Sequence, residues 1–114
     1  MFELPTNFSW LPPWSPLDDP QDVVGLAEEL RREISAGHLL FDCQFVAIGY
    51  SERYDDFLFV TDCVDRPIAV VHLTWKKETD PTWPFAIVYP NLDGWVSAMA
   101  ADNVEYVREQ NGNA

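Results

Sequence analysis

The sequence predicts an α+β domain in two layers: a four-stranded antiparallel meander with one helix before it and one after it. Apolar residues recur at spacings of three and four over 20–36 and again over 92–109, which predicts two helices. Between them lie four β-branched and aromatic runs of strand length. No helical pattern separates these runs, so antiparallel hairpins are favoured over parallel crossovers. A chain of 114 residues has room for one core.

We expect the first helix to span 20–36. Asp19 is a suitable N-cap, Pro20 fits the first helical position, and Gly37 is a natural stop. The apolar stripe consists of Val23, Leu26, Ala27, Leu30 and Ile34. The opposite face is predicted to be solvated and without function, and it carries Glu28, Glu29, Arg31, Arg32 and Glu33.

The four strands are predicted at 44–50, 57–61, 68–75 and 85–89. Several strands are apolar on both faces: Phe57 and Phe59 alternate with Leu58 and Val60. A sheet with two apolar faces needs cover on both sides. The N-terminal arm or a second copy of the chain, as a homodimer, would supply the cover that the helices leave out.

The second helix is predicted over 92–109, with Asn91 as its N-cap. Leu92, Trp95, Val96, Met99 and Val107 form its apolar side. Residues 110–114 read as a frayed polar tail, so the single domain is expected to span 20–109.

Residues 1–19 form a separate arm in this prediction. The arm contains four prolines with Phe2, Phe8, Trp10 and Trp14 between them. Proline removes amide donors and fixes φ, so the arm is expected to be extended. Its aromatic residues either cover the domain's own surface, which we favour, or insert into a partner.

Charge is the strongest global signal. The chain has 19 acidic and 7 basic residues, for a net charge of -12. Such a field repels nucleic acid and anionic membranes and steers the chain toward a basic protein partner, although solubility alone also explains it. No uninterrupted apolar run is long enough to cross a membrane and no signal-peptide pattern is present, which predicts a cytoplasmic protein.

The two cysteines do not form a recognisable motif. Cys43 and Cys63 are predicted to be buried free thiols, because two cysteines twenty positions apart match neither a disulfide framework nor a cysteine zinc site. A thiol triad of either cysteine with His72 and Asp62 can be written, but neither cysteine begins a helix or follows a glycine-rich elbow.

His72 shares a predicted strand face with Ile68, Val70 and Thr74, so a half-buried structural histidine is favoured over a general base or a metal ligand. The acidic residues of the two predicted hairpin turns are read as solvated, although they offer oxygen ligands for a divalent ion. These residues are Glu52, Asp55, Asp56, Asp62 and Asp65. No glycine-rich phosphate loop is present, and neither a metal nor a cofactor is predicted.

The stretch IAVVHLTWKKETDPTWPFAIVYPNLDGWV resembles small bacterial proteins in which a strand ending in HLTW leads through a loop ending in WP to another strand and a terminal helix. The resemblance covers roughly residues 20 to 107 and is most specific in HLTW and WP. A Ser-Gly turn follows the HLTW tryptophan in those proteins, whereas Lys76 and Lys77 stand here. The resemblance implies a shared fold and no established activity.

Two functions follow from these observations. The favoured one is a small, acidic, non-catalytic binding protein, such as an immunity-like inhibitor or antitoxin of a basic partner. The alternative is a small ligand-binding domain or enzyme with a pocket near His72, Trp75 and Trp83. No catalytic residue is assigned. The candidate partner or ligand surface comprises Trp10, Trp14, His72, Trp75, Trp83, Glu52, Asp55 and Asp56.

Overall fold

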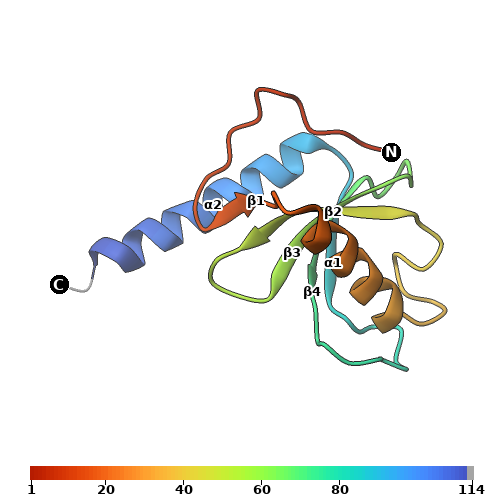
Figure 1. The fold of residues 1–114 in the computed structure, drawn as a ribbon. Helices are drawn as coiled ribbons and strands as arrows, with labels where there is room; N and C mark the ends of the chain where they lie inside the picture. The colour runs from red at the N-terminus through yellow and green to blue at the C-terminus, as the bar shows by residue number, and fades with distance from the viewer. Residues whose placement is uncertain (113–114) are drawn as a thin grey trace.

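The computed structural model describes residues 1–112 and has seven elements. In chain order they are β1 (Trp14–Pro16), α1 (Pro20–Glu33), β2 (Phe45–Ser51), β3 (Asp56–Thr61), β4 (Ile68–His72), β5 (Ala86–Tyr89) and α2 (Leu92–Asn111). The strands form one antiparallel sheet in the order β1-β2-β3-β4-β5 (Figure 1). The α+β class and the meander are confirmed.

The sheet has five strands rather than the predicted four. The additional strand is β1, which lies in the proline-rich arm and pairs with the end of β2 through Trp14 and Ser51. Pro16 lacks an amide hydrogen, so β1 is suited to the edge of the sheet, where one row of donors has no neighbouring strand.

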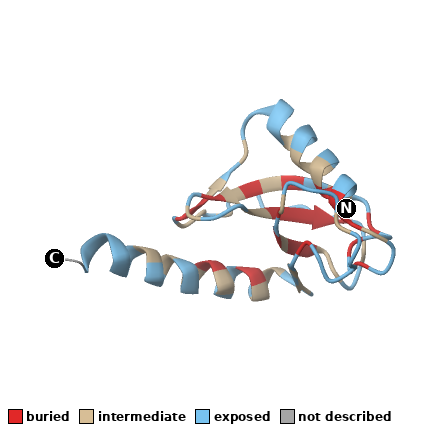
Figure 2. Cartoon of the chain, turned by 90° about the horizontal axis from the view of Figure 1, so that it is seen from below, coloured by how far each residue is buried: buried red, intermediate tan, exposed pale blue. Residues whose placement is uncertain are grey.

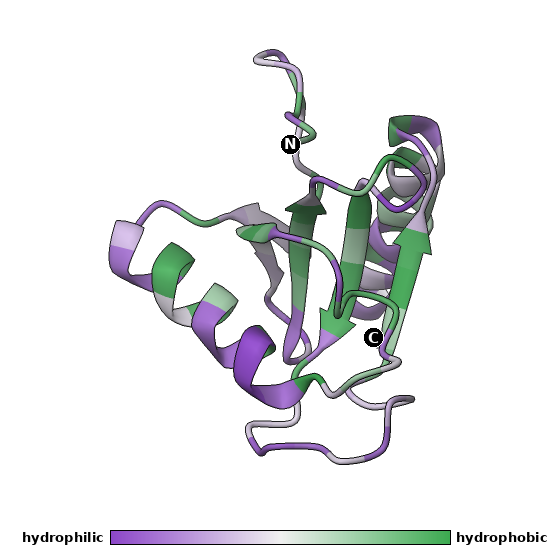
Figure 3. Cartoon of the chain, turned by 90° about the vertical axis from the view of Figure 1, so that its right-hand side faces the viewer, coloured by the Kyte–Doolittle hydropathy of each residue, from purple (hydrophilic) through white to green (hydrophobic). Residues whose placement is uncertain are grey.

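The two helices cover opposite faces of the sheet, so the domain has three layers instead of the expected two (Figure 2). On one face, Phe59, Ala69 and Val71 form a core with Leu30 of α1. On the other, Leu58 and Ile68 contact the core that contains Trp95 of α2. Figure 3 shows the apolar strands between the two helices. Because the strands are apolar on both faces, each face of the sheet has to be covered.

The N-terminal arm packs on the α2 side of its own sheet, as favoured from the sequence. Trp14 is buried, meets Trp95 edge to face at 5.0 Å between ring centroids, and donates from Nε1 to Asp102 at 2.9 Å. Trp10 is partly buried and lies over Gly49, where an added Cβ would come within 2.5 Å of the Trp10 ring. A glycine at this position of β2 therefore lets the arm approach the sheet.

Helix α1 begins as predicted, because the Asp19 side chain accepts the Gln21 amide and Pro20 is the first helical residue. It ends at Glu33, three residues earlier than expected, where Ile34 adopts an extended conformation. Gly37 then has a φ of 97°, which favours glycine. The prediction that Glu33 is solvated is wrong, since this residue is fully buried.

Helix α2 is capped by Asn91, which accepts the Gly94 amide as predicted. The helix continues to Asn111, so residues 110 and 111 belong to it, while 113 and 114 of the predicted tail lie outside the described residues. Its buried residues are Trp95 and Met99, near the start, and its C-terminal half extends beyond the sheet (Figure 1). No helix within residues 1–112 is long and apolar enough to cross a membrane.

Cys43 and Cys63 form a disulfide, which corrects the prediction of free thiols. Cys43 lies just before β2, and Cys63 lies just after β3. Phe45 and Thr61 are register partners, so antiparallel pairing brings the two cysteines together although twenty positions separate them in the chain. The disulfide therefore depends on the register of β2 and β3, which cannot be predicted from the spacing of the two cysteines in the sequence.

Candidate functional site

The candidate site lies at the end of the sheet where β2 turns into β3 and β4 ends. His72, the last residue of β4, is the register partner of Asp56, the first residue of β3. The His72 side chain is 51% exposed. About half of the side chain is therefore covered, as expected for a structural histidine that is hydrogen-bonded to a neighbour, and the other half is open to solvent.

His72 is oriented by the strand opposite. Its Nδ1 lies 2.8 Å from Oδ1 of Asp56. An ionised carboxylate only accepts hydrogen bonds, so Nδ1 carries the proton and donates it. Nε2 makes no hydrogen bond to any residue from 1 to 112.

Two hollows meet at His72 and Asp55. The first, which we call the tryptophan groove, has a volume of about 500 Å³ and is also lined by Trp75 and Trp83. The second, the hairpin groove, has a volume of about 650 Å³ and is formed by the turn from Tyr50 to Asp55. The structure thus brings together His72, Trp75 and Trp83, which the sequence placed in one candidate site.

The tryptophan groove owes its shape to a sharp turn directly after β4. The predicted strand over 68–75 ends three residues early, and Leu73 donates its amide to the carbonyl of Asp55. Trp75 has a φ of 63°, a left-handed conformation that is unfavourable for a bulky residue. The turn carries the Trp75 ring out to the surface, where 48% of the residue is exposed.

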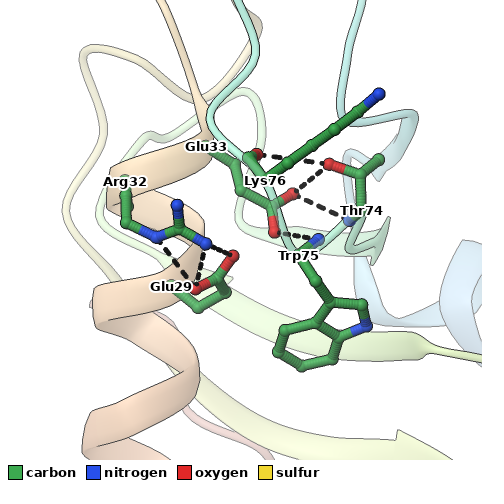
Figure 4. A network of polar contacts seen from close by, with 6 residues as sticks. All are labelled: Glu29, Arg32, Glu33, Thr74, Trp75 and Lys76. Carbon is green, nitrogen blue, oxygen red and sulfur yellow. Dashed lines mark hydrogen bonds and ion pairs between the residues drawn. The ribbon is translucent and has the colours of Figure 1, made fainter.

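Buried Glu33 holds this turn (Figure 4). Its carboxylate accepts the Thr74 amide at 2.9 Å, the Thr74 hydroxyl at 3.1 Å and the Trp75 amide at 2.7 Å. Two successive backbone amides converge on one carboxylate, which is the way a backbone nest binds an anion. Glu33 is therefore the residue that positions Trp75.

Burial raises the pKa of Glu33, and the neighbouring Glu29 adds to the rise, while the amides of Thr74 and Trp75 oppose it. The pKa of Glu29 is lowered, first by its hydrogen bond with Glu33 and then by Arg32. Arg32 donates to Glu29 at 2.6 Å (Figure 4). Of the two carboxyl groups, Glu29 therefore loses its proton first as pH rises.

The ring of Trp75 also packs edge to face on Phe57, with 6.0 Å between ring centroids. Trp83 follows a tight turn in which Asp80 accepts hydrogen bonds from Thr82, and Trp83 donates its amide to the Asp80 carbonyl. Trp83 is 47% exposed. Both tryptophans are consequently held by their backbones while their rings remain accessible.

The buried histidine is His38, which sequence reasoning did not single out. Its Nε2 lies 2.8 Å from the carbonyl of Pro84, and its Nδ1 accepts the Leu40 amide at 3.0 Å. Burial lowers the pKa of His38. His38 therefore ties the loop after α1 to the residue that follows Trp83, a link that no local motif indicates.

Charged side chains line both grooves. Asp55 lines both, Glu52 lines the hairpin groove, and Glu78 lines the tryptophan groove, where it pairs with Lys76 at 4.0 Å. Glu52 also accepts the Ser15 hydroxyl at 3.1 Å. Arg53 lies in the same turn, but it is bound to Glu109 at 2.7 Å.

Two members of the predicted partner surface are not at this site. Trp14 is buried under α2 and is not available to a partner, and Trp10 rests on the sheet within the arm. The other six members lie around the grooves. Five of them line a groove, and Asp56 is hydrogen-bonded to one of these five, His72. These six are Glu52, Asp55, Asp56, His72, Trp75 and Trp83.

The thiol triad that can be written from the sequence is not assembled. The cysteines are bonded to each other beyond the Thr61 end of β3, whereas His72 pairs with the Asp56 end. The acidic turn residues also lie at opposite ends of β3, with Asp55 and Asp56 at its start and Asp62 just after its end. Within residues 1–112, the ligand-type side chains that gather closely enough for a metal ion are Cys43, Asp62 and Cys63.

Comparison with known protein families, with curated proteins and with solved structures found no match to this chain. The resemblance through the HLTW and WP elements therefore stays a prediction, and the geometry of the grooves is what a functional proposal has to rest on.

Proposed function

We propose that the chain is a non-catalytic binding protein that recognises a basic partner protein through the tryptophan groove. An arginine or lysine side chain of the partner lies against Trp75 and Trp83, and the neighbouring carboxylates balance its charge. An inhibitor of the immunity type, or an antitoxin, is the biological role that fits such a surface.

The observation that carries the proposal is the pair of half-exposed tryptophans in one hollow with Asp55. Glu78 of the same hollow is already paired with Lys76 at 4.0 Å, so Asp55 is the carboxylate that a cation would meet there. Indole rings attract a cation placed over their faces, with a contribution of about 0.5–2 kcal/mol depending on desolvation. Exposed aromatic anchors that the backbone already holds in place lose little entropy on binding.

The charge of the whole chain supports the same partner class. With a net charge of -12, the protein attracts cationic surfaces at long range and accelerates their encounter. Salt bridges take up part of the basic side chains: Arg32 binds Glu29, Arg66 binds Asp65, and Arg108 binds Glu105. The field that a partner meets is therefore dominated by carboxylates.

A blocked tetra-arginine peptide is a defined probe for this proposal, with tetra-glycine as the uncharged comparison. We expect calorimetry at low salt to show binding of the arginine peptide alone. Trp75→Ala should weaken it about tenfold, which corresponds to ~1.4 kcal/mol. The indole signal of Trp83 in NMR spectra should shift when the peptide is added.

Phe41→Ala is the matched control, because Phe41 is a comparably exposed aromatic residue that precedes the start of β2, away from the grooves. It should leave peptide affinity unchanged. Equal losses in the Trp75 and Phe41 variants, or no binding by the native chain, would contradict the proposal. Binding should also weaken at ~1 M salt, where the Debye length is about 3 Å.

A second candidate, a small ligand-binding domain or enzyme, is favoured by one observation. His72 is fixed by Asp56 through Nδ1, and it lies beside a hollow whose volume is in the range of small-molecule sites. An NMR screen with uncharged small molecules separates the two. Fragments that shift His72 and Trp83 while the arginine peptide does not would favour this candidate.

A further inference from the structure

We propose that reduction of the Cys43–Cys63 disulfide creates a zinc site whose ligands are the two thiolates and the carboxylate of Asp62. The sulfur atoms of both cysteines and a carboxylate oxygen of Asp62 lie within 4.8 Å of one another. This cluster is at the opposite end of β3 from the tryptophan groove, so the inference is independent of the function proposed above.

The spacing suits zinc. Zn²⁺ binds thiolate sulfur at about 2.3 Å and carboxylate oxygen at about 2.0–2.2 Å in tetrahedral geometry, which places two sulfurs on the same ion roughly 3.8 Å apart. The Cα atoms of Cys43 and Cys63 are 5.7 Å apart. Small side-chain rotations therefore convert a bonded pair of sulfurs into a pair that holds one ion.

The backbone around the cluster is held by bonds that do not involve the disulfide. Asp62 donates its amide to the Gln44 carbonyl at 3.1 Å, and its Oδ1 accepts the Gln44 amide at 2.8 Å. Cys63 donates its amide to Oγ1 of Thr61 at 3.0 Å. Because β2 and β3 pair beside these residues, reduction leaves the three ligands close together.

The hydrogen bond from Gln44 also has the character of an outer-shell interaction. A carboxylate ligand that accepts a backbone N–H is fixed in orientation, which strengthens metal binding. That bond uses one oxygen of Asp62, and the second oxygen remains for the ion. Asp62 is exposed while Cys43 is fully buried, so water can reach the fourth position from the Asp62 side.

The chemistry balances with a dithiol as reductant. The Cys43–Cys63 bond breaks as it takes two electrons and two protons from the dithiol, which closes its own disulfide. Zinc then replaces the two thiol protons, which pass to the buffer as two Zn–S bonds form. Two soft thiolates favour zinc over magnesium or calcium at this position.

The test measures zinc bound after gel filtration, using the full chain in its reduced and oxidised forms. We expect one zinc per reduced chain and none per oxidised chain. Cobalt added to the reduced chain should give thiolate-to-cobalt charge-transfer absorption. Cys63→Ser should abolish binding, and Asp62→Asn should weaken it at least ~10-fold.

Asp42→Asn is the matched control, because Asp42 is an exposed acidic residue next to Cys43 and outside the three-ligand cluster. It should bind zinc as the native chain does. Circular dichroism establishes that each variant is folded. A folded, reduced native chain without zinc, or equal affinities in the Asp62 and Asp42 variants, would overturn the proposal.

Discussion

Replacing Glu33 by alanine removes the acceptor of the turn after β4. The carboxylate accepts the amides of Thr74 and Trp75, which then have no partner. Leaving a buried N–H unpaired costs about 1–3 kcal/mol, so two such groups cost about 4 kcal/mol. Loss of a buried charge offsets part of this, and we expect the free energy of unfolding to fall by about 3 kcal/mol.

Urea unfolding followed by tryptophan fluorescence measures the change, and the melting temperature should fall by roughly 12 °C, at about 4 °C per kcal/mol. NMR should show the Trp75 amide signal moving more than amides of the sheet. Glu28→Ala is the matched control, since Glu28 lies exposed on the same helix and should change stability by no more than ~0.5 kcal/mol. Equal stabilities of the Glu33 and Glu28 variants would refute the assigned role of Glu33.

Three further predictions concern stability. Replacing Cys43 and Cys63 together by serine should cost about 3 kcal/mol, because the disulfide closes a loop with a sequence separation of 20, and urea midpoints of the variant and native chain check this. Burial lowers the pKa of His38 below its ordinary value of 6.5. As pH falls below 6.5, His38 therefore gains a proton in the unfolded chain before it does in the folded chain. Stability should therefore decline from about pH 6.5 down to the lowered folded pKa, and this slope should be absent in His38→Gln. Gly49→Ala should cost about 2 kcal/mol in thermal melts, because its Cβ would come within 2.5 Å of the Trp10 ring; an unchanged melting temperature would contradict that packing.

Helix starts and strand cores were readable from the sequence because their signals are local. Asp19 and Asn91 cap the helices that were expected after them, and both caps accept an amide within three residues. The alternation in β4 also holds, with Val71 on the α1 side and Val70 on the α2 side. Each of these features depends on neighbours along the chain.

Glu33 and His38 show why part of the site was not predictable. Both are polar residues near the end of α1, and a helical pattern places Glu33 on the charged face. Burial of Glu33 depends on Thr74 and Trp75, which are 41 and 42 positions away in the chain. The partner of His38 is the Pro84 carbonyl, 46 positions away.

The sequence by itself determined the class of fold, the antiparallel meander, both helix starts and the acidic field, since these follow from composition and from spacings within a few residues. Only the tertiary structure decided that the helices lie on opposite faces, that the cysteines are bonded, and that His72, Trp75 and Trp83 surround one groove. Those outcomes depend on strand register and on hydrogen bonds between distant segments, which exist only once the chain has folded.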